Sequence, residues 1–323
     1  MTAAVDIVIP SIGRPSLAAL LARLERDRLP GRVIVVDDSV GGAVELPERA
    51  PLGTVVVRTA GGAGPAAARN AGWRRAEAPF VAFLDDDVLP GDGWVGDLVE
   101  DARRADPDVA AVQGRITVPR RARATDWERN TARLETATWI TADLVVRRSA
   151  LEEIGGFDER FRRAYREDTD LAVRLLRAGW RLGRGQRRTA HPVRPAPWWV
   201  SVGMQAGNAD DVLLERLHSN WRDVVGEAPG RYRRHQRTVA LLVGAVVAAV
   251  AGRRRSALLL GGLWLIASGA FAWERISPGP RSCREVLAMT ATSVAIPPVA
   301  VWYRCRGRLD HRDVRPWPIE RAD

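Results

Sequence analysis

Short apolar runs rich in β-branched residues alternate with stretches of helical periodicity in the first part of the chain. Val5–Pro10 and Val33–Asp38 are two such runs, each ending in polar residues. Between them, leucines recur at helical spacing, at Leu17, Leu20, Leu21 and Leu24. This pattern predicts a strand–helix–strand unit.

The same alternation continues to about residue 180. Thr54–Arg58 predicts a third strand, Pro65–Ala76 a helix that begins at its proline, and Phe80–Leu84 a fourth, buried strand. Further elements are expected as a helix near Gly93–Arg104, strands at Val109–Gly114 and Trp139–Arg147, and a helix at Glu167–Gly179. Such alternation predicts an α/β fold with a mainly parallel sheet and helices on both faces.

Beyond a basic boundary at Arg231–Arg237 the pattern changes to three uncharged apolar stretches, Thr238–Gly252, Ser256–Trp273 and Val286–Tyr303. A membrane-spanning helix needs roughly 20 residues, so the first stretch is short and the others are marginal. Three arginines separate the first two stretches, and Pro297-Pro298 interrupts the third. We expect membrane insertion or a re-entrant hairpin, with a buried helical bundle as the alternative.

We therefore predict a catalytic domain over residues 1–230 and a helical, membrane-associated tail over residues 231–323. The tail carries 16 Arg against 6 acidic residues, so the whole net charge of +10 lies there. Arginine interleaved with apolar runs suits an anionic membrane surface better than a nucleic acid. Because every apolar stretch has basic flanks, charge does not set the topology.

Composition also excludes some chemistry. The chain has no lysine, which rules out a Walker A phosphate loop and a pyridoxal Schiff base. Its two cysteines, Cys283 and Cys305, lie in the tail and indicate neither a zinc site nor a disulfide framework. A reduced, cytoplasmic setting fits this usage, and the first residues do not resemble a signal peptide.

Two acidic clusters, Asp37-Asp38 and Asp85–Asp87, fall at predicted strand ends, where open α/β sheets bind ligands. Side chains alternate along a strand, so Asp85 and Asp87 should point to one side and Asp86 to the other. Paired carboxylates suit Mg²⁺ or Mn²⁺, which commonly bridge a protein to a diphosphate. A solvated acidic loop or a helix cap is the alternative.

Six segments together resemble the inverting family-2 glycosyltransferases with the GT-A fold, in the family's order and spacing over about Val5 to Leu182. They are VDIVIPS (Val5–Ser11), VIVVDDS (Val33–Ser39), GPAAARNAG (Gly64–Gly72), FVAFLDDDVLP (Phe80–Pro90), GGFDERF (Gly155–Phe161) and EDTDLAVRLLRAGWR (Glu167–Arg181).

The resemblance implies a site for a nucleotide-sugar donor. In it, Asp38 would contact the nucleotide base, with the backbone of Pro10 and Ser11 and the side chain of Arg69 nearby. Asp85–Asp87 would be the DxD element. Within that element, Asp86 would face the ribose or sugar, and Asp87, together with Asp85, would hold the metal at the diphosphate.

The resemblance also implies that Glu167-Asp168 is the family's ED pair, with Asp168 as general base and Glu167 in a lesser role. Sugar transfer with inversion needs a base for the acceptor proton and a cation for the departing diphosphate. Capping of a helix N-terminus, with a dipole interaction of about 1 kcal/mol, is the alternative for this pair.

Weaker candidates follow. Gly61–Gly64 could cradle phosphate or form a simple turn. Asp143 lies where related enzymes meet the donor sugar or acceptor, although an ordinary strand-end aspartate is as good a reading. His191 is either a diphosphate or metal contact or a structural histidine, and Trp198-Trp199 could line an acceptor groove, sit at a membrane interface or pack in the core. The missing Q-x-x-R-W signature disfavours a processive polymerase.

The predicted function is metal-dependent, inverting transfer of a sugar from a nucleotide-sugar donor to an acceptor hydroxyl. A lipid-linked or cell-envelope glycan acceptor fits the apolar tail, with the protein at the cell membrane and its catalytic domain in the cytoplasm. A nucleotidyltransferase of similar fold and a non-catalytic nucleotide-sugar-binding or scaffold protein are the alternatives.

Overall fold

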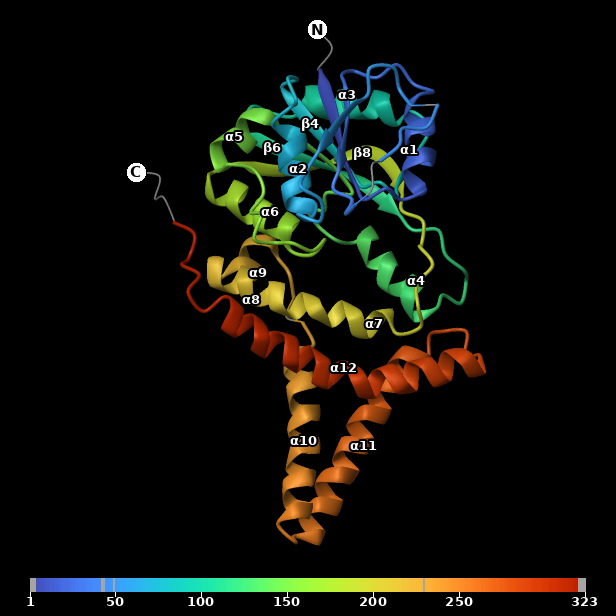
Figure 1. Cartoon of the computed structure of the whole chain (residues 1–323), viewed down its shortest axis with the longest axis vertical. Coiled ribbons are helices and arrows are strands. Elements are labelled where there is room, and N and C mark those ends of the chain that lie inside the picture. The colour runs from blue at the N-terminus through green and yellow to red at the C-terminus, as the bar shows by residue number, and fades with distance from the viewer. Residues whose placement is uncertain (1–3, 42–43, 49, 229, 319–323) are drawn as a thin grey trace. The chain divides into compact units, whose positions relative to one another are not determined.

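The computed structural model describes residues 4–41, 44–48, 50–228 and 230–318, and the chain divides into two compact units (Figure 1). The first unit contains the residues up to Pro119 and the segment Ala132–Pro192. The second contains Arg120–Thr131 and Val193–Trp317. The second unit thus begins before the basic boundary at Arg231–Arg237, because its helices before residue 230 pack on the last helix of the chain. The catalytic domain over residues 1–230 stays a prediction, and residues 319–323 of the tail lie outside the described residues.

An eight-stranded sheet forms the centre of the first unit. Its order is β3 (Val55–Arg58), β2 (Val33–Asp37), β1 (Val5–Ser11), β4 (Phe80–Leu84), β7 (Asp143–Arg147), β6 (Val109–Thr117), β8 (Arg181–Ala190) and β5 (Leu89–Pro90). The first four strands are parallel, as are β6 and β8, whereas β7 and β5 pair antiparallel with their neighbours. The expected mainly parallel α/β sheet is confirmed.

Helices cover both faces of this sheet (Figure 1). The helices of the unit are α1 (Ser16–Leu24), α2 (Pro65–Trp73), α3 (Trp94–Arg104), α5 (Arg148–Ile154) and α6 (Glu167–Arg177). Apolar residues of α2, α5 and α6 pack with alternate residues of the strands, such as Val8, Ile34 and Phe83, into one core. On α1 the four leucines predicted to form its apolar stripe are all buried.

Helix α2 begins at Pro65, as predicted, and ends at Trp73, three residues before the predicted end. The preceding Gly64 has φ of 98°, a conformation that residues with a side chain rarely adopt. A Cβ atom at Gly72 would lie 2.3 Å from Cγ1 of Val8, so α2 lies directly against β1. These two glycines fix where the helix starts and how closely it approaches the sheet.

Strand β7 begins at Asp143 and not at Trp139, because Trp139 has φ of 63° and its amide donates to Oε1 of Gln113. Strands β8 and β5 are absent from the sequence prediction. The outward positions of β8 are largely arginine, so the strand has no apolar signature, and β5 has only two residues.

The second unit is helical. It contains α4 (Asp126–Thr131), α7 (Val200–Gly203), α8 (Gly207–Leu217), α9 (Trp221–Val225), α10 (Tyr232–Val250), α11 (Arg254–Ile276) and α12 (Cys283–Asp310). The last three correspond to the three predicted apolar stretches. Contrary to the prediction, Pro297-Pro298 does not interrupt α12, which runs through both prolines. A proline removes one backbone donor and bends a helix without necessarily ending it.

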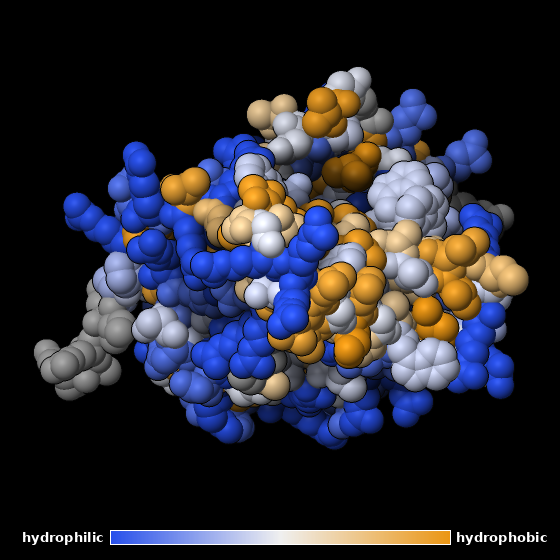
Figure 2. Space-filling view, turned by 90° about the horizontal axis from the view of Figure 1, so that it is seen from below, coloured by the Kyte–Doolittle hydropathy of each residue, from blue (hydrophilic) through white to orange (hydrophobic). Residues whose placement is uncertain are grey.

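Helices α11 and α12 are long and apolar enough to cross a membrane, with 17% and 33% of their most apolar windows buried. Helices α10 and α11 pack against each other and expose apolar side chains such as Val247, Leu258 and Ile266. Figure 2 shows apolar side chains gathered in patches on the surface seen from below, with many hydrophilic side chains beside them. A core helix of a soluble bundle would be mostly buried, so these helices are an indication, weak by itself, of membrane association.

Candidate active site

The three consecutive aspartates follow β4 directly and occupy a turn. As predicted, Asp86 points away from the other two. Its Oδ2 accepts a hydrogen bond from Oγ of Ser11 at 2.7 Å, and its Oδ1 pairs with Nη1 of Arg14 at 2.7 Å. Asp86 is 1% exposed, so the end of β1 and the loop after it hold this carboxylate firmly.

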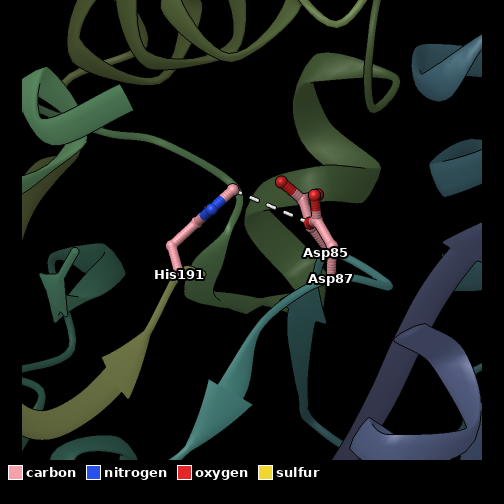
Figure 3. Close-up of side chains that lie close together, drawn as sticks. All are labelled: Asp85, Asp87 and His191. Carbon is pink, nitrogen blue, oxygen red and sulfur yellow. Dashed lines mark ion pairs between the residues drawn. The ribbon is translucent and has the colours of Figure 1, made fainter. Parts of the chain in front are cut away.

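On the other side of the turn, Asp85 and Asp87 meet His191 (Figure 3). One ligand atom from each of the three residues lies within 4.8 Å of the others, and Nε2 of His191 is 3.7 Å from Oδ1 of Asp87. The histidine reaches this place because it follows β8, whose last residues pair with β5 just after the aspartates. Its amide donates to the carbonyl of Thr117 at 2.8 Å, which fixes the chain there. Two carboxylates and an imidazole form a donor set that fits a divalent cation.

Arg69 of α2 connects this turn with the N-terminus of α6. Its Nη2 lies 2.8 Å from Oδ1 of Asp85, and its Nη1 lies 2.9 Å from Oε1 of Glu167. The guanidinium is almost completely buried and also lies over the ring of Phe157, 5.6 Å from its centroid. Carboxylates that are 82 residues apart in the chain, Asp85 and Glu167, therefore converge on one buried cation.

Glu167 is in an unusual environment for an acid. Its side chain is buried, and its Oε2 has no hydrogen-bond partner among the described residues. Burial, and next the charge of Asp168, raise the pKa of Glu167 to about 8, although Arg69 acts in the opposite direction. At neutral pH this carboxyl therefore retains much of its proton.

Asp168 is only partly buried and stands in the first turn of α6. Its Oδ1 accepts a hydrogen bond from the amide of Thr169 at 2.7 Å, whereas its Oδ2 makes no hydrogen bond within the described residues. Burial raises the pKa of Asp168 above its usual range, against the effect of Arg69. The preceding residue, Arg166, has φ of 77°, an uncommon conformation for a residue with a side chain that is often found at functional sites.

Asp38, the predicted contact of the nucleotide base, is buried beside the glycine-rich loop. Its Oδ1 accepts from the amide of Ala63 at 2.9 Å and from the hydroxyl of Thr59, and its Oδ2 accepts from the amide of Gly64 at 2.8 Å. The loop amides are thus used to hold Asp38, which favours the turn over the phosphate cradle. Pro10 and Ser11 lie at the adjacent end of β1, in register with the end of β2.

Asp143 lies apart from these residues. It is fully buried at the start of β7, where its Oδ1 accepts from Nε of Arg187 at 2.7 Å. Its Oδ2 accepts from Trp94 at 2.8 Å and from Thr189 at 2.6 Å. Both oxygens are used within the chain, so this geometry favours the structural alternative, and a donor contact by Asp143 stays a prediction.

Two residues near the site carry roles that the sequence did not suggest. Arg14 pairs with Asp86, and Asn70 holds the GGFDERF loop by bonding to both the carbonyl and the amide of Phe157 at 2.9 Å. Asn70 belongs to GPAAARNAG, a segment that carries the family resemblance, whereas Arg14 lies three residues after the end of VDIVIPS, and neither has a chemical type that singles it out.

The family model described as "Glycosyl transferase family 2" matches residues 6–167, half of the chain. The chain belongs to this family. The match ends at Glu167, so it includes Arg69 and the three aspartates.

Curated relatives come from Mycobacterium tuberculosis. A pre-mycofactocin glycosyltransferase is 36% identical over 200 residues, covering 55% of this chain and 40% of the relative. An N-acetylglucosaminyl-diphospho-decaprenol L-rhamnosyltransferase is 54% identical over 43 residues, covering 13% of this chain and 14% of the relative. These matches thus span less than half of each relative.

Two solved structures show the fold. The mannosyltransferase PcManGT from Pyrobaculum calidifontis, in complex with GDP-Man and Mn²⁺, has a TM-score of 0.55 at 20% identity, covering 92% of this chain and 87% of that one. GalNAc-T7, with UDP, GalNAc and Mn²⁺, has a TM-score of 0.50 at 17% identity, covering 69% and 49%. Both are GT-A enzymes, so the expected fold class is confirmed.

Proposed function

We propose that this glycosyltransferase moves a sugar from a nucleotide-sugar donor to an acceptor hydroxyl, with inversion and with the help of a divalent cation. The observation that carries the proposal is the position of the buried Arg69. Its guanidinium pairs with Asp85, a candidate cation ligand, and with Glu167 of the Glu167-Asp168 pair. A base and a cation site in one place are what such a transfer requires.

Asp85, Asp87 and His191 would hold the cation, because their ligand atoms already lie within 4.8 Å of one another. The imidazole in this set favours Mn²⁺ over Mg²⁺, which prefers oxygen ligands alone. When bound, the cation supplies positive charge to the diphosphate of the leaving group. Both solved structures above contain Mn²⁺, which supports this part of the proposal.

Asp168 is the proposed general base. Its Oδ2 is available to accept the proton of the acceptor hydroxyl, while the amide of Thr169 holds Oδ1 in place. Glu167 keeps its proton at neutral pH, so Asp168 does not face a second full negative charge when it ionises. Attack by the activated hydroxyl opposite the leaving group inverts the anomeric carbon.

The donor-binding residues are proposed on the same basis. Asp38 would contact the base through Oδ2, which accepts one described hydrogen bond and retains a lone pair, whereas Oδ1 already accepts two. The backbone of Pro10 and Ser11 lies beside it, and Asp86 would contact the ribose or sugar with Arg14 at hand. The two solved structures contain GDP-Man and UDP, so they support a nucleotide-sugar donor without selecting its base.

For the acceptor we propose a lipid-linked or envelope glycan, reached at the cytoplasmic face of the cell membrane. The apolar α11 and α12 and the excess of arginine in the tail support a membrane location. The name of the rhamnosyltransferase relative describes a sugar on diphospho-decaprenol. A second candidate acceptor is of the pre-mycofactocin type, which the longer curated match favours.

The test is turnover of the purified full-length protein with a panel of nucleotide sugars and with each candidate acceptor. We expect turnover with Mn²⁺, loss of turnover with a chelator, and a product whose anomeric configuration, assigned by NMR, is opposite to that of the donor. Retention of configuration would overturn the assignment of Asp168 as base.

The cation site has a matched pair of variants. Asp87→Asn should raise the half-saturating Mn²⁺ concentration by at least about tenfold, since even outer residues of metal sites change affinity that much. Asp106→Asn, at an exposed carboxylate paired with Arg181, should leave it unchanged. Equal Mn²⁺ dependence of the two variants would contradict the assignment of Asp87.

A further inference from the structure

The second unit contains an apolar groove with a volume of about 390 Å³. This volume lies within the roughly 300–1,000 Å³ that is typical of ligand pockets. One wall is a face of α12 formed by residues at intervals of four, and the other comes from the segment around α7. The residues that matter here are Ala291, Ala295, Val299 and Tyr303 on one side and Trp198 and Trp199 on the other.

The groove exists because the side chains on its α12 wall include small ones, and two large aromatic side chains border it. The alanines give α12 a shallow surface, whereas Trp198 and Trp199 are half-exposed and pack edge to face, with their centroids 5.5 Å apart. Tryptophan concentrates at the interface between membrane and water, where its ring is partly buried and partly wet. An exposed pair of tryptophans beside an apolar cavity is typical of a binding surface and not of a packed core.

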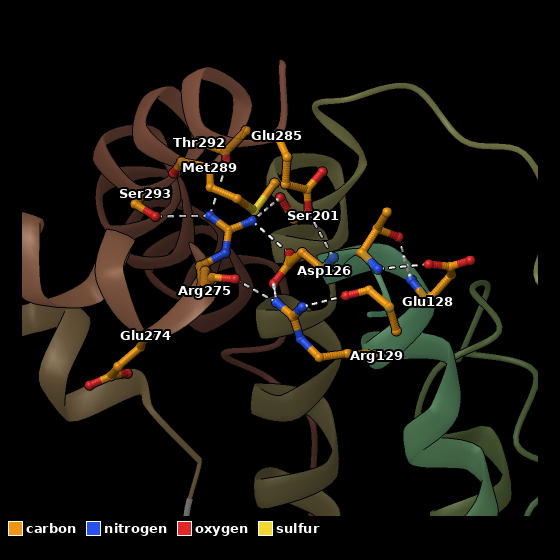
Figure 4. Close-up of polar contacts among 12 residues, drawn as sticks. Asp126, Glu128, Arg129, Ser201, Glu274, Arg275, Glu285, Met289, Thr292 and Ser293 are labelled. Atoms are coloured by element: carbon orange, nitrogen blue, oxygen red, sulfur yellow. Dashed lines mark hydrogen bonds and ion pairs between the residues drawn. The ribbon is translucent and has the colours of Figure 1, made fainter. Parts of the chain in front are cut away.

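The buried Arg275 of α11 bonds to both walls (Figure 4). Its Nη1 donates to Oγ1 of Thr292 at 2.8 Å and to Oγ of Ser293 at 3.0 Å, both on α12. Its Nη2 donates to Oγ of Ser201 on α7 at 2.9 Å and to Oδ2 of Asp126 at 2.8 Å. One guanidinium therefore sets the distance between α7 and α12.

This network also decides what the groove can recognise. Thr292 is the hydroxyl residue that lines both the groove and the network, and it donates to the carbonyl of Ala288 at 2.7 Å while it accepts from Arg275. With that hydroxyl engaged, the polar groups left on the lining side chains are the phenol of Tyr303 and the indole N–H groups of Trp198 and Trp199, and the rest of the lining is apolar. An occupant is bound through apolar contact, which is worth about 25 cal/mol for each Å² removed from water.

We propose that this groove binds a hydrocarbon chain of a membrane lipid. The α12 wall belongs to a helix long and apolar enough to cross a membrane, and the same helix exposes Leu287, Val294 and Trp302. Arginines stand at both ends of the same helix: Arg281 before it, Arg284 in its first turn, and Arg304, Arg306 and Arg308 near its end. Positive flanks attract anionic headgroups, and the groove accepts the chain that such a lipid carries. The proposal rests on the membrane location in the proposed function but on neither the donor nor the base.

The test uses full-length protein reconstituted in phosphatidylglycerol vesicles, released into a mild detergent and weighed by native mass spectrometry. Ala295→Trp fills the groove, and Leu287→Trp adds a similar ring at an exposed position of the same helix. We expect a lipid adduct on the wild type and on Leu287→Trp, and loss of most of that adduct on Ala295→Trp. Equal adducts on all three proteins would overturn the proposal.

A second measurement does not depend on a bulky substitution. In vesicles of phosphatidylglycerol brominated along its acyl chains, bromine quenches indole fluorescence at contact. The quenched fraction should fall in the double variant Trp198→Phe, Trp199→Phe, and no change would count against the groove as the binding place. Flotation of the vesicles tests the membrane location separately from the groove. A protein that does not float with the vesicles refutes the membrane location. A protein that floats but carries no lipid adduct refutes lipid binding in the groove alone.

Discussion

Two buried arginines of the sheet unit lie between pairs of carboxylates, and they differ in how completely their surroundings satisfy them. Arg187 donates to Asp143 at 2.7 Å, to Asp101 at 2.7 Å and to the carbonyl of Val112 at 2.5 Å. Arg69 donates to Asp85 and Glu167, but its Nε has no partner among the described residues. We call the cluster around Arg187 closed, because every nitrogen of its guanidinium donates a hydrogen bond. We call the cluster around Arg69 open, because the Nε of Arg69 does not.

The difference lies in what remains available for chemistry. Around Arg187, both oxygens of Asp143 are used and the residue is fully buried. Around Arg69, Glu167 keeps an unpartnered oxygen and Asp85 is 30% exposed. Natural proteins leave few buried polar groups unsatisfied, and functional sites are where they do so. Similar ion pairs can therefore stabilise a fold in one place and serve a reaction in another.

The largest expected effect is on the open cluster. Asp168→Asn keeps the shape of the side chain but removes the proposed base, so turnover should fall by about 10²–10⁴-fold. The measurement is the initial rate under saturating donor, acceptor and Mn²⁺, with circular dichroism to show that the fold is intact. Asp108→Asn, at an exposed carboxylate paired with Arg181, is the matched control and should turn over normally. Native-like rates for Asp168→Asn would refute the base assignment.

The next effect is on the closed cluster and concerns stability. Arg187→Met leaves two buried carboxylates without their cation, and breaking a buried pair in this way costs about 3–5 kcal/mol. Arg69→Met should destabilise the protein less, because Glu167 already holds most of its proton at neutral pH and Asp85 is partly solvated. Its loss of turnover per folded molecule should nonetheless be the larger. Denaturant unfolding ranks the two variants by loss of stability, and initial rates rank them by loss of turnover. If the same variant were the more affected in both measurements, the distinction between a structural and a functional arginine would be contradicted.

A smaller effect separates the two readings of Asp143. If this residue is structural, Asp143→Asn lowers the midpoint of unfolding, while the KM for the donor stays within about twofold of the wild-type value. A donor contact instead predicts a raised KM at unchanged stability. Since the hydrogen bonds of Asp143 are charge-assisted, the stability loss should be about 1.5–3 kcal/mol. Thermal unfolding and donor titration on the same preparation decide between them.

The smallest effect is on pH dependence. Burial raises the pKa of Glu167 to about 8, so the folded state holds this proton more tightly than the unfolded state, in which the pKa is about 4.3. The stability from this group is full below the unfolded pKa and is lost as pH rises through about 8. The Tm of the wild type should therefore fall between pH 5 and 8 relative to Glu167→Gln. Glu100→Gln, at an exposed helix position, is the control and should not change the pH profile in this way. A wild-type Tm that rises between pH 5 and 8 relative to Glu167→Gln would refute the buried environment described for Glu167.

Much of the fold followed from periodicity, because β1, β2, β4 and α6 bury their apolar residues in regular patterns. Strand β8 did not, since its outward positions are arginines and only its neighbours β6 and β5 show it to be a strand. The continuity of α12 through Pro297-Pro298 also depends on packing that no local pattern contains.

For the candidate site, the sequence indicated segments that the structure brings together around Arg69, but not the partners within them. The split of Asp86 from Asp85 and Asp87 is confirmed, although the three residues form a turn and not a strand. The convergence of His191 on them depends on the β5–β8 pairing, which was not predicted. The contrast between Arg69 and Arg187 is equally invisible in the sequence, because it depends on which carboxylate each guanidinium reaches across more than 40 residues.

Gly72 has a consequence for the chemistry three residues before it on α2. A methyl group at this position would have to push the helix away from β1, because it would overlap Val8. Such a shift would carry Arg69 with it and lengthen its contacts with Asp85 and Glu167, although Gly72 touches neither. The distance between α2 and β1 thus sets how far the guanidinium of Arg69 reaches. A single atom added to the sheet-facing side of α2 would therefore misalign Arg69 with the two carboxylates.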